Sequence, residues 1–223
     1  KLCQIGYIFY YISLGQVLSF VMLIFGFVLI FKASGVFNFA QGAMVLFAAL
    51  NLVGFIEQGF PIWLALVCTI AVMIILAFLI ERFMLRHLIN QEDIILFMAT
   101  IGLTFLLQGF GEMLWGSNVK PLDLGIPNQS FEVGDLLLNE FDLFAAGSGA
   151  ILVGVLAVFF HYTRIGRALR AVADDHQAAM AVGIPLKTIW IIVWSVAGFV
   201  ALVAGIMWGT KSGVQFSLSL IAL

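Results

Sequence analysis

Charged residues are scarce in this chain of 223 residues. Asp, Glu, Lys and Arg together make up 10% of the sequence, and the formal net charge is −2. Soluble domains carry about 25% charged residues, whereas this chain is 63% hydrophobic and has a mean hydropathy of +1.15. The composition excludes a soluble globular domain and indicates no basic patch for nucleic acid. It predicts a membrane protein.

Cysteine and histidine are also rare, which limits the chemistry available. Cys3 and Cys68 lie in apolar segments without the spacing of metal ligands, so we expect two thiols that are buried or face lipid, with a disulfide as the alternative. His87, His161 and His176 have no neighbouring ligand set such as H-E-x-x-H. The sequence also lacks G-x-S-x-G and the Walker A pattern. We therefore expect no catalytic residues, metal or cofactor, and any nucleotide hydrolysis must come from another chain.

Long apolar runs dominate what is present. A helix needs about 20 apolar residues to cross a membrane, and six charge-free runs have roughly this length. Continuous runs of this kind favour helices over barrel strands. The sequence predicts an all-α, polytopic transmembrane bundle of about six to seven spans, in which residues 212–223 form a truncated seventh span or a re-entrant piece. The six runs are residues 8–31, 33–56, 62–80, 94–111, 143–160 and 189–210.

The basic residues predict the orientation of these spans, because cytoplasmic loops are enriched in Lys and Arg. Residues 112–142 contain one basic residue against six acids and are predicted to be external. The loop 161–187 is predicted to be cytoplasmic. Seven of the ten basic residues then face the cytoplasm: Lys32, Arg82, Arg86, Arg164, Arg167, Arg170 and Lys187. The external loop is either a solvated connector or a ledge for an external partner, with short helices or strands.

The polar residues within the spans are neutral, which argues against a carrier driven by ions or protons. They are Asn38, Gln41, Asn51, Thr69, Thr100, Thr104, Gln108 and Ser195. Asn38, Gln41 and Gly42 interrupt the second apolar run, as in a discontinuous helix that lines a substrate path. The alternative is that the two amides bond across helices and Gly42 allows close packing. Five other glycines are predicted to be packing positions: Gly102, Gly109, Gly111, Gly198 and Gly205.

Residues 162–185 form a charged, helix-prone insert between the last two apolar runs. Leu169, Val172, His176, Ala179 or Met180, and Gly183 recur at helical spacing and predict a narrow, small and mostly apolar face. Gly183 suits the left-handed position that ends a helix, and the following proline prevents continuation. The arginines of this insert meet either lipid headgroups or a protein socket, and Asp174 and Asp175 favour the socket.

Three sequence blocks resemble the membrane subunit of the branched-chain (hydrophobic) amino acid ABC importer family. Residues 38–42 (N-F-A-Q-G) are similar to the family's N-F-A-H-G, with Gln41 where many members have His. Glu81-Arg82 through Leu107, with T-I-G at 100–102 and Gln108, resembles a second pattern. Residues 166–175 (G-R-A-L-R-A-V-A-D-D) with Gly183 resemble the coupling-loop signature. The similarity extends over about residues 12–210.

The resemblance implies one permease domain, 1–223, in a bacterial plasma (inner) membrane. It implies a second permease subunit, the same or related, two cytoplasmic ATPase subunits and an external substrate-binding protein. The coupling helix would be residues 166–183, with Gly166, Arg167, Arg170, Asp174, Asp175, Ala179 and Gly183 as coupling residues. The substrate path is expected at Asn38, Gln41, Gly42, Thr100 and Gln108.

The expected function is therefore transport of branched-chain or hydrophobic amino acids. Relatives carry urea or short amides, so these substrates, or a sugar, are the alternative. A membrane-embedded enzyme and a structural subunit are the rival classes. Because the chain begins at Lys1 and stops inside an apolar run, and the family normally continues with further spans, we expect both ends to be incomplete.

Overall fold

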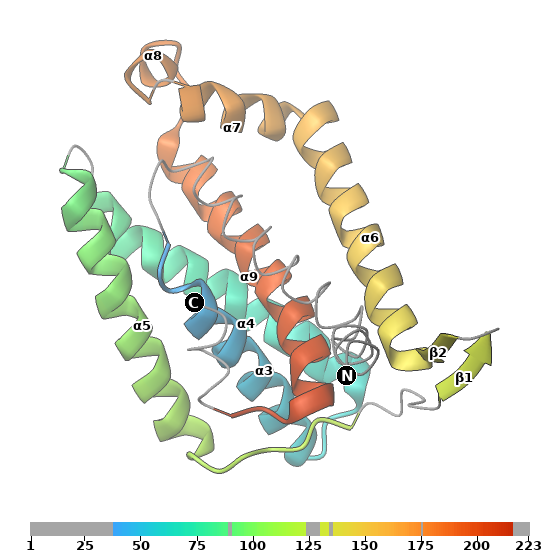
Figure 1. Ribbon diagram of the computed structural model, residues 1–223. Helices are drawn as coiled ribbons and strands as arrows, with labels where there is room; N and C mark the ends of the chain where they lie inside the picture. The colour runs from blue at the N-terminus through green and yellow to red at the C-terminus, as the bar shows by residue number, and fades with distance from the viewer. Residues whose placement is uncertain (1–37, 89–90, 124–129, 134–135, 175, 216–223) are drawn as a thin grey trace, which may run out of the picture.

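The computed structural model describes residues 38–88, 91–123, 130–133, 136–174 and 176–215 and is built almost wholly of helices (Figure 1). The predicted first span, residues 8–31, and residues 216–223 lie outside the described residues. The all-α class is confirmed, with one small hairpin added. The elements are α3 (Gln41–Glu57), α4 (Ile62–Phe83), the 3-10 turn η1 (Leu85–His87), α5 (Asp93–Trp115), β1 (Ser130–Val133), β2 (Leu136–Asn139), α6 (Glu140–Tyr162), α7 (Arg164–Asp174), α8 (His176–Ala181) and α9 (Leu186–Ser212).

Four of the predicted apolar runs each lie within one helix: α4, α5, α6 and α9. Among the described residues, Ile62–His87, Ile94–Trp115 and Leu186–Lys211 are long and apolar enough to cross a membrane, and α6 adds a fourth if it is taken with the bent α7. The helix in the second run begins only at Gln41 and has 17 residues. The total of six to seven spans therefore stays a prediction for the whole chain.

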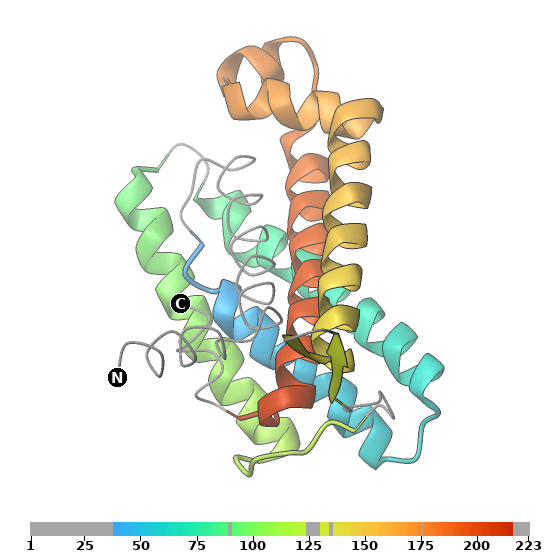
Figure 2. The ribbon, with the colours of Figure 1, turned by 45° about the vertical axis from the view of Figure 1, so that its right-hand side comes forward.

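Helix α3 lies at the centre of the described helices. Every residue from Gln41 to Gly54 is buried, and α4, α5 and α9 all pack against α3 (Figures 1 and 2). A helix that is hydrophobic on all sides is stable only when it is enclosed by other elements. By contrast, α4 and α5 bury one face and expose large apolar side chains on the other, such as Trp63 and Phe105. These outer faces suit lipid.

Glycines bring α9 and α5 close to the core. A Cβ at Gly198 would lie 3.2 Å from Met73 Cβ, one at Gly205 would lie 2.8 Å from the Val45 carbonyl oxygen, and one at Gly111 would lie 3.1 Å from Leu50 Cδ1. Small residues let helix backbones approach closely inside a membrane. The prediction of packing glycines is confirmed at these three positions. It is not borne out at Gly102 and Gly109, where no described residue lies within 4 Å of an added Cβ.

Helix α6 packs on the core at its two ends and in its middle, where Leu152 and Leu156 belong to the main core cluster. At its start, Phe141 and Ala145 pack with Met207 of α9, and Ser148 Oγ lies 3.8 Å from Met207 Sδ. At its end, α6 continues through a corner into α7, which packs on α9 (Figure 1). A cavity of about 340 Å³ lies between α4, α6 and α9. The β1–β2 hairpin precedes α6, so the predicted external loop does hold strands.

Candidate functional site

The residues predicted to interrupt the second span form a buried turn at the start of α3. Asn38 is 0% exposed and Gln41 is 2% exposed. Asn38 Oδ1 accepts a hydrogen bond from the Ala40 N–H at 3.0 Å, and Asn38 Nδ2 donates to Gln41 Oε1 at 3.5 Å. An Asn side chain that bonds the backbone two residues ahead stabilises a turn in place of helix. The polar break therefore marks where this helix begins.

Two threonines of α5 hold this turn in place. The Phe39 N–H donates to Thr100 Oγ1 at 3.2 Å, and Thr104 Oγ1 donates to the Phe39 carbonyl at 3.2 Å. The Phe39 and Phe97 rings meet edge to face with centroids 4.9 Å apart. Thr100 and Thr104 are one helical turn apart, so they face the same side of α5. The structure thus brings Asn38, Gln41 and Thr100 together, and their role in a substrate path stays a prediction.

Other residues of the predicted path are placed less directly. Gly42 is buried in the first turn of α3, and Gln108 is half-buried two turns beyond Thr100 on α5. Gln41 Nε2 is buried and has no hydrogen-bond partner among the described residues. An unsatisfied buried donor costs about 1–3 kcal/mol. The polar turn therefore contains one amide that can still donate a hydrogen bond.

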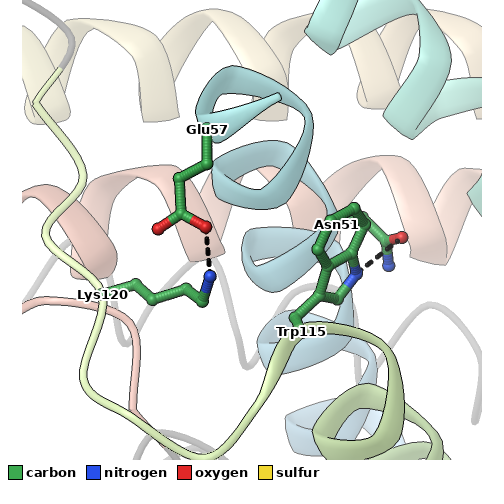
Figure 3. A network of polar contacts seen from close by, with 4 residues as sticks. All are labelled: Asn51, Glu57, Trp115 and Lys120. Carbon is green, nitrogen blue, oxygen red and sulfur yellow. Dashed lines mark hydrogen bonds and ion pairs between the residues drawn. The ribbon is translucent and has the colours of Figure 1, made fainter. Parts of the chain in front are cut away.

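A second polar network, which the sequence did not reveal, lies at the other end of α3 (Figure 3). Trp115 Nε1 donates to Asn51 Oδ1 at 3.3 Å, while Asn51 Nδ2 donates to the Phe47 carbonyl at 2.7 Å. Lys120 forms an ion pair with Glu57 and exchanges two backbone hydrogen bonds with Val214, of 3.0 and 2.8 Å. We call Asn51, Glu57, Trp115, Lys120 and Val214 the clasp. The only signal for it in the sequence is an Asn within an apolar helix.

The corner between α6 and α7 explains one of the predicted coupling glycines. The two helices are bent by 80° at Thr163. Thr163 Oγ1 accepts a hydrogen bond from the Gly166 N–H at 2.9 Å, which caps the start of α7. A Cβ at Gly166 would lie 2.2 Å from the Phe160 carbonyl oxygen. Only glycine fits this corner.

The predicted single coupling helix, residues 166–183, is wrong in its continuity, because the chain forms two helices, α7 and α8. Asp174 is the last residue of α7, and Asp175 lies outside the described residues. The end at Gly183 is confirmed, since its φ is +87°. The Gly183 N–H donates to the Met180 carbonyl at 2.9 Å and the Ile184 N–H donates to the Ala179 carbonyl at 3.0 Å. This pair of bonds is a Schellman motif.

The apolar face of this segment turns toward the chain itself. Leu169, Val172 and Ala179 are at most 4% exposed and belong to the same core cluster as Ile189 of α9. The prediction that Leu169, Val172 and Ala179 seat in a partner's groove is therefore wrong, whereas Met180 and Gly183 of the predicted face are exposed. Arg164, Arg167 and Arg170 are exposed on α7, and Met180 and Val182 are exposed beyond it, at 42% and 83%. The outward face is basic with an apolar end.

The end of α4 contains a buried acid, Glu81. Glu81, near the end of α4, is 2% exposed, and its Oε1 lies 3.5 Å from Arg86 Nε. Its other oxygen has no hydrogen-bond partner among the described residues. The ion-pair partner of Glu81 is therefore Arg86, five residues further along the chain, and not the adjacent Arg82 of the sequence pattern.

These features define a membrane-embedded helical protein with a buried polar turn and a capped, outward-facing basic segment. The class is confirmed by comparison with known families. The family model described as "Branched-chain amino acid transport system / permease component" matches residues 9–222, and the chain belongs to this family. The resemblance drawn from the three sequence blocks is thereby confirmed.

Individual relatives agree with this family. The chain is 25% identical over 226 aligned residues to the "High-affinity branched-chain amino acid transport system permease protein LivH" of Escherichia coli (strain K12), with 91% of this chain and 70% of that protein covered. It is 23% identical over 212 residues to the permease BraD of Pseudomonas aeruginosa, covering 88% and 68%. It is 32% identical over 120 residues to the "Probable ABC transporter permease protein YphD" of Escherichia coli (strain K12), covering 52% and 34%. No solved structure matches the chain significantly.

Proposed function

We propose that this chain is the permease subunit of an ATP-driven importer that moves branched-chain or other hydrophobic amino acids across a bacterial plasma membrane. The observation that carries the proposal is the family match over residues 9–222, together with relatives whose names specify branched-chain amino acid transport. The sequence has no nucleotide-binding motif of its own. Two cytoplasmic ATPase subunits, a second permease and an external binding protein would complete the transporter.

The basic face of α7 is the proposed contact with the ATPase. Arg164, Arg167 and Arg170 are exposed on α7, and arginine suits bonding to carboxylates on a protein surface. The opposite face, with Leu169 and Val172, packs into the core against α9. A push on α7 would therefore reach α9 through packed side chains and α6 through the rigid corner at Gly166. Gly166 and Gly183 would shape the segment, and Arg167 and Arg170 would make the contact.

This contact can be tested with a charge reversal that leaves the core untouched. The double variant Arg167→Glu, Arg170→Glu should abolish substrate-stimulated ATP hydrolysis and co-purification of the ATPase, while the chain remains folded. Lys120→Glu, at the opposite end of the core, is the matched control and should keep the ATPase bound. Full coupling in the double variant would exclude this face as the contact. Ala179→Arg is unsuitable as a test, because Ala179 is 4% exposed and its change would disturb the core.

The polar turn at the start of α3 is the proposed substrate path. Asn38, Gln41, Gly42 and Thr100 are buried in this conformation, so the path would open when the turn moves away from α5. The free donor at Gln41 Nε2 would then bond the carboxylate of an amino acid. Gln108 would lie further along the same face of α5. Opening would break the two hydrogen bonds between Phe39 and the threonines.

Uptake into proteoliposomes that contain the whole transporter tests both path and substrate. Labelled leucine should accumulate in an ATP-dependent manner, whereas urea, a short amide and a sugar should not. Gln41→Ala should lower leucine uptake about tenfold by removing one hydrogen bond to a charged group. Gln58→Ala, at the exposed end of the same helix, should leave uptake unchanged. Transport of urea or sugar instead of leucine would refute the substrate assignment.

The proposed orientation places Asn118 outside and Val182 inside, and both residues are exposed. In a chain without its native cysteines, single cysteines at these positions should react with an impermeant thiol reagent from opposite sides of the membrane. Reaction of both from the same side would overturn the orientation.

A further inference from the structure

A groove of about 750 Å³ lies between α4 and α5. The two helices follow each other in the chain, yet each packs on α3 and hardly on the other. In Figure 2 they diverge from their connection. Leu76, Leu79 and Phe83 of α4 line one wall, Leu103 and Leu106 of α5 line the other, and Phe47 of α3 forms part of the floor. Both helices pack on α3, but the groove between them is open.

The groove opens toward the membrane and not into the protein core. Phe83 is 70% exposed, Leu106 is 61% exposed and Leu79 is 42% exposed. Both walls belong to helices that are long and apolar enough to span a membrane. The groove therefore lies where lipid tails would surround the helices.

The groove reaches the connection between α4 and α5 at His87 and Leu88, and we call this end its mouth. Among the described residues that line the groove, His87 is the only one with a polar side chain. Arg82 is exposed beside Phe83, and Arg86 is half-buried and paired with Glu81. On the α5 side of this connection, Glu92 is exposed and is the residue before α5, where its side chain makes no capping hydrogen bond. The α4 side of the connection thus carries donors and the α5 side carries a carboxylate.

We propose that this groove binds one phospholipid whose headgroup combines a phosphate with a primary ammonium, as in phosphatidylethanolamine. The acyl chain would lie between α4 and α5, the phosphate near Arg82 and His87, and the ammonium near Glu92. Basic pockets between spans at a membrane surface commonly bind lipid headgroups. The acid on the opposite side favours a zwitterionic headgroup over an anionic one.

The lining of the groove fits an acyl chain. Its two walls are aliphatic and aromatic side chains of α4 and α5, and its floor includes Phe47 of α3, which suits an acyl chain lying along it. The inference requires only that the chain is embedded in a membrane, so it stands independently of the proposed substrate and partners.

The test is native mass spectrometry of the full chain released from nanodiscs that contain equal amounts of phosphatidylethanolamine, phosphatidylcholine and phosphatidylglycerol. We expect one phosphatidylethanolamine to be retained preferentially. Leu103→Trp, which fills the groove, should abolish retention. Phe105→Trp, on the same helix but outside the groove, should not. Equal retention of the three lipids by the native chain, or unchanged retention in Leu103→Trp, would overturn the proposal.

Two milder variants test the headgroup contacts if Leu103→Trp does not fold. Arg82→Gln should lower lipid retention about fivefold, the effect of one basic residue at a membrane surface. Glu92→Gln should remove the preference for phosphatidylethanolamine over phosphatidylcholine, whose methylated ammonium cannot donate a hydrogen bond. Arg164→Gln, on α7, is the control and should change neither quantity. Retention that is insensitive to both Arg82 and Glu92 would show that the mouth does not recognise the headgroup.

A photo-reactive leucine at position 106 separates the remaining occupants. Crosslinking to lipid is the expected result. Crosslinking mainly to residues 8–31, or to a second copy of the chain, would show that protein fills the groove and would refute the proposal.

Discussion

The α6–α7 corner and the clasp hold the two ends of α9 by contacts of different range along the chain. At the corner, Thr163 bonds to Phe159 and Gly166, which are four and three residues away. In the clasp, Trp115 bonds Asn51 across 64 residues and Lys120 bonds Glu57 across 63 (Figure 3). The corner is formed by hydrogen bonds between residues that are close together in the sequence. The clasp exists only when three distant segments are already folded together.

This difference matches the role proposed for the corner. A segment that transmits force must be stiff, and the capped 80° corner between α6 and α7 joins two helices without a flexible loop. The clasp instead joins α3, the segment after α5 and the segment after α9 through few polar contacts. We expect the corner to depend on backbone geometry and the clasp to depend on side-chain partners. Four predictions test this contrast, and each is measured as resistance to unfolding in detergent with increasing denaturant.

Gly166→Ala should have the largest effect, because its Cβ would lie 2.2 Å from a backbone oxygen that cannot move aside without opening the corner. We expect a loss of about 3 kcal/mol in the free energy of unfolding. Gly147→Ala, near the start of α6 and facing open space, is the control and should be neutral or slightly stabilising. Equal stability of the two variants would show that the corner is not tightly packed.

Asn51→Ala should come next, with a loss of about 2 kcal/mol, since it leaves the Trp115 indole N–H without its acceptor. Trp115→Phe removes the same bond from the other side. If the clasp depends on this pair, the double variant should cost less than the sum of the two single variants. Strict additivity would mean that the two side chains act independently. Asn118→Ala, which is exposed, should have no effect.

Gly183→Ala should cost about 1–2 kcal/mol, because a side chain disfavours the left-handed conformation with φ of +87°. Gly183→Asn should cost less, since asparagine tolerates this conformation better than alanine does. Limited proteolysis near residue 182 should be slowest in the native chain, faster in Gly183→Asn and fastest in Gly183→Ala. An alanine variant as stable as the asparagine variant would contradict a backbone origin of the effect.

Lys120→Gln should have the smallest effect, about 0.2–1 kcal/mol, since the Glu57 side chain is 49% exposed and water screens the ion pair. The two backbone bonds between Lys120 and Val214 do not depend on the side chain. High salt should reduce the difference between the native chain and the variant. A large loss would show that the Lys120 side chain, and not the backbone, holds the clasp, and a loss insensitive to salt would show that it does so by contacts other than the screened ion pair.

The fold could be predicted from the sequence in its local parts. Apolar runs located α4, α5, α6 and α9, and Gly183 located the end of α8. The break between α7 and α8 was missed, because residues 166–183 contain no proline or turn pair to signal it. The sequence predicted only that the external loop holds short helices or strands. Whether a short segment forms a strand depends on the segment with which it pairs.

The candidate site could be predicted only in part. Asn38, Gln41 and Thr100 stood out as polar groups within apolar runs, and the structure brings them together. Thr104 was noted but received no role, although it holds the same turn. The apolar face with Leu169, Val172 and Ala179 was found from its spacing, but its direction was predicted wrongly. Periodicity identifies a face that is buried, and it contains no information on which surface buries it.

Neighbouring residues and solvent preference were enough to specify the membrane class, four of the helices, the helix end at Gly183 and the family. The folded chain was needed to show that α3 is central, that Glu81 pairs with Arg86 near the end of α4, that Ala179 faces inward and that Lys120 meets Glu57 and Val214. Helix formation and burial depend on short-range bonds and on transfer from water, which composition and periodicity express. The choice of partner depends on which helices come together, and that is settled by the packing of the whole chain.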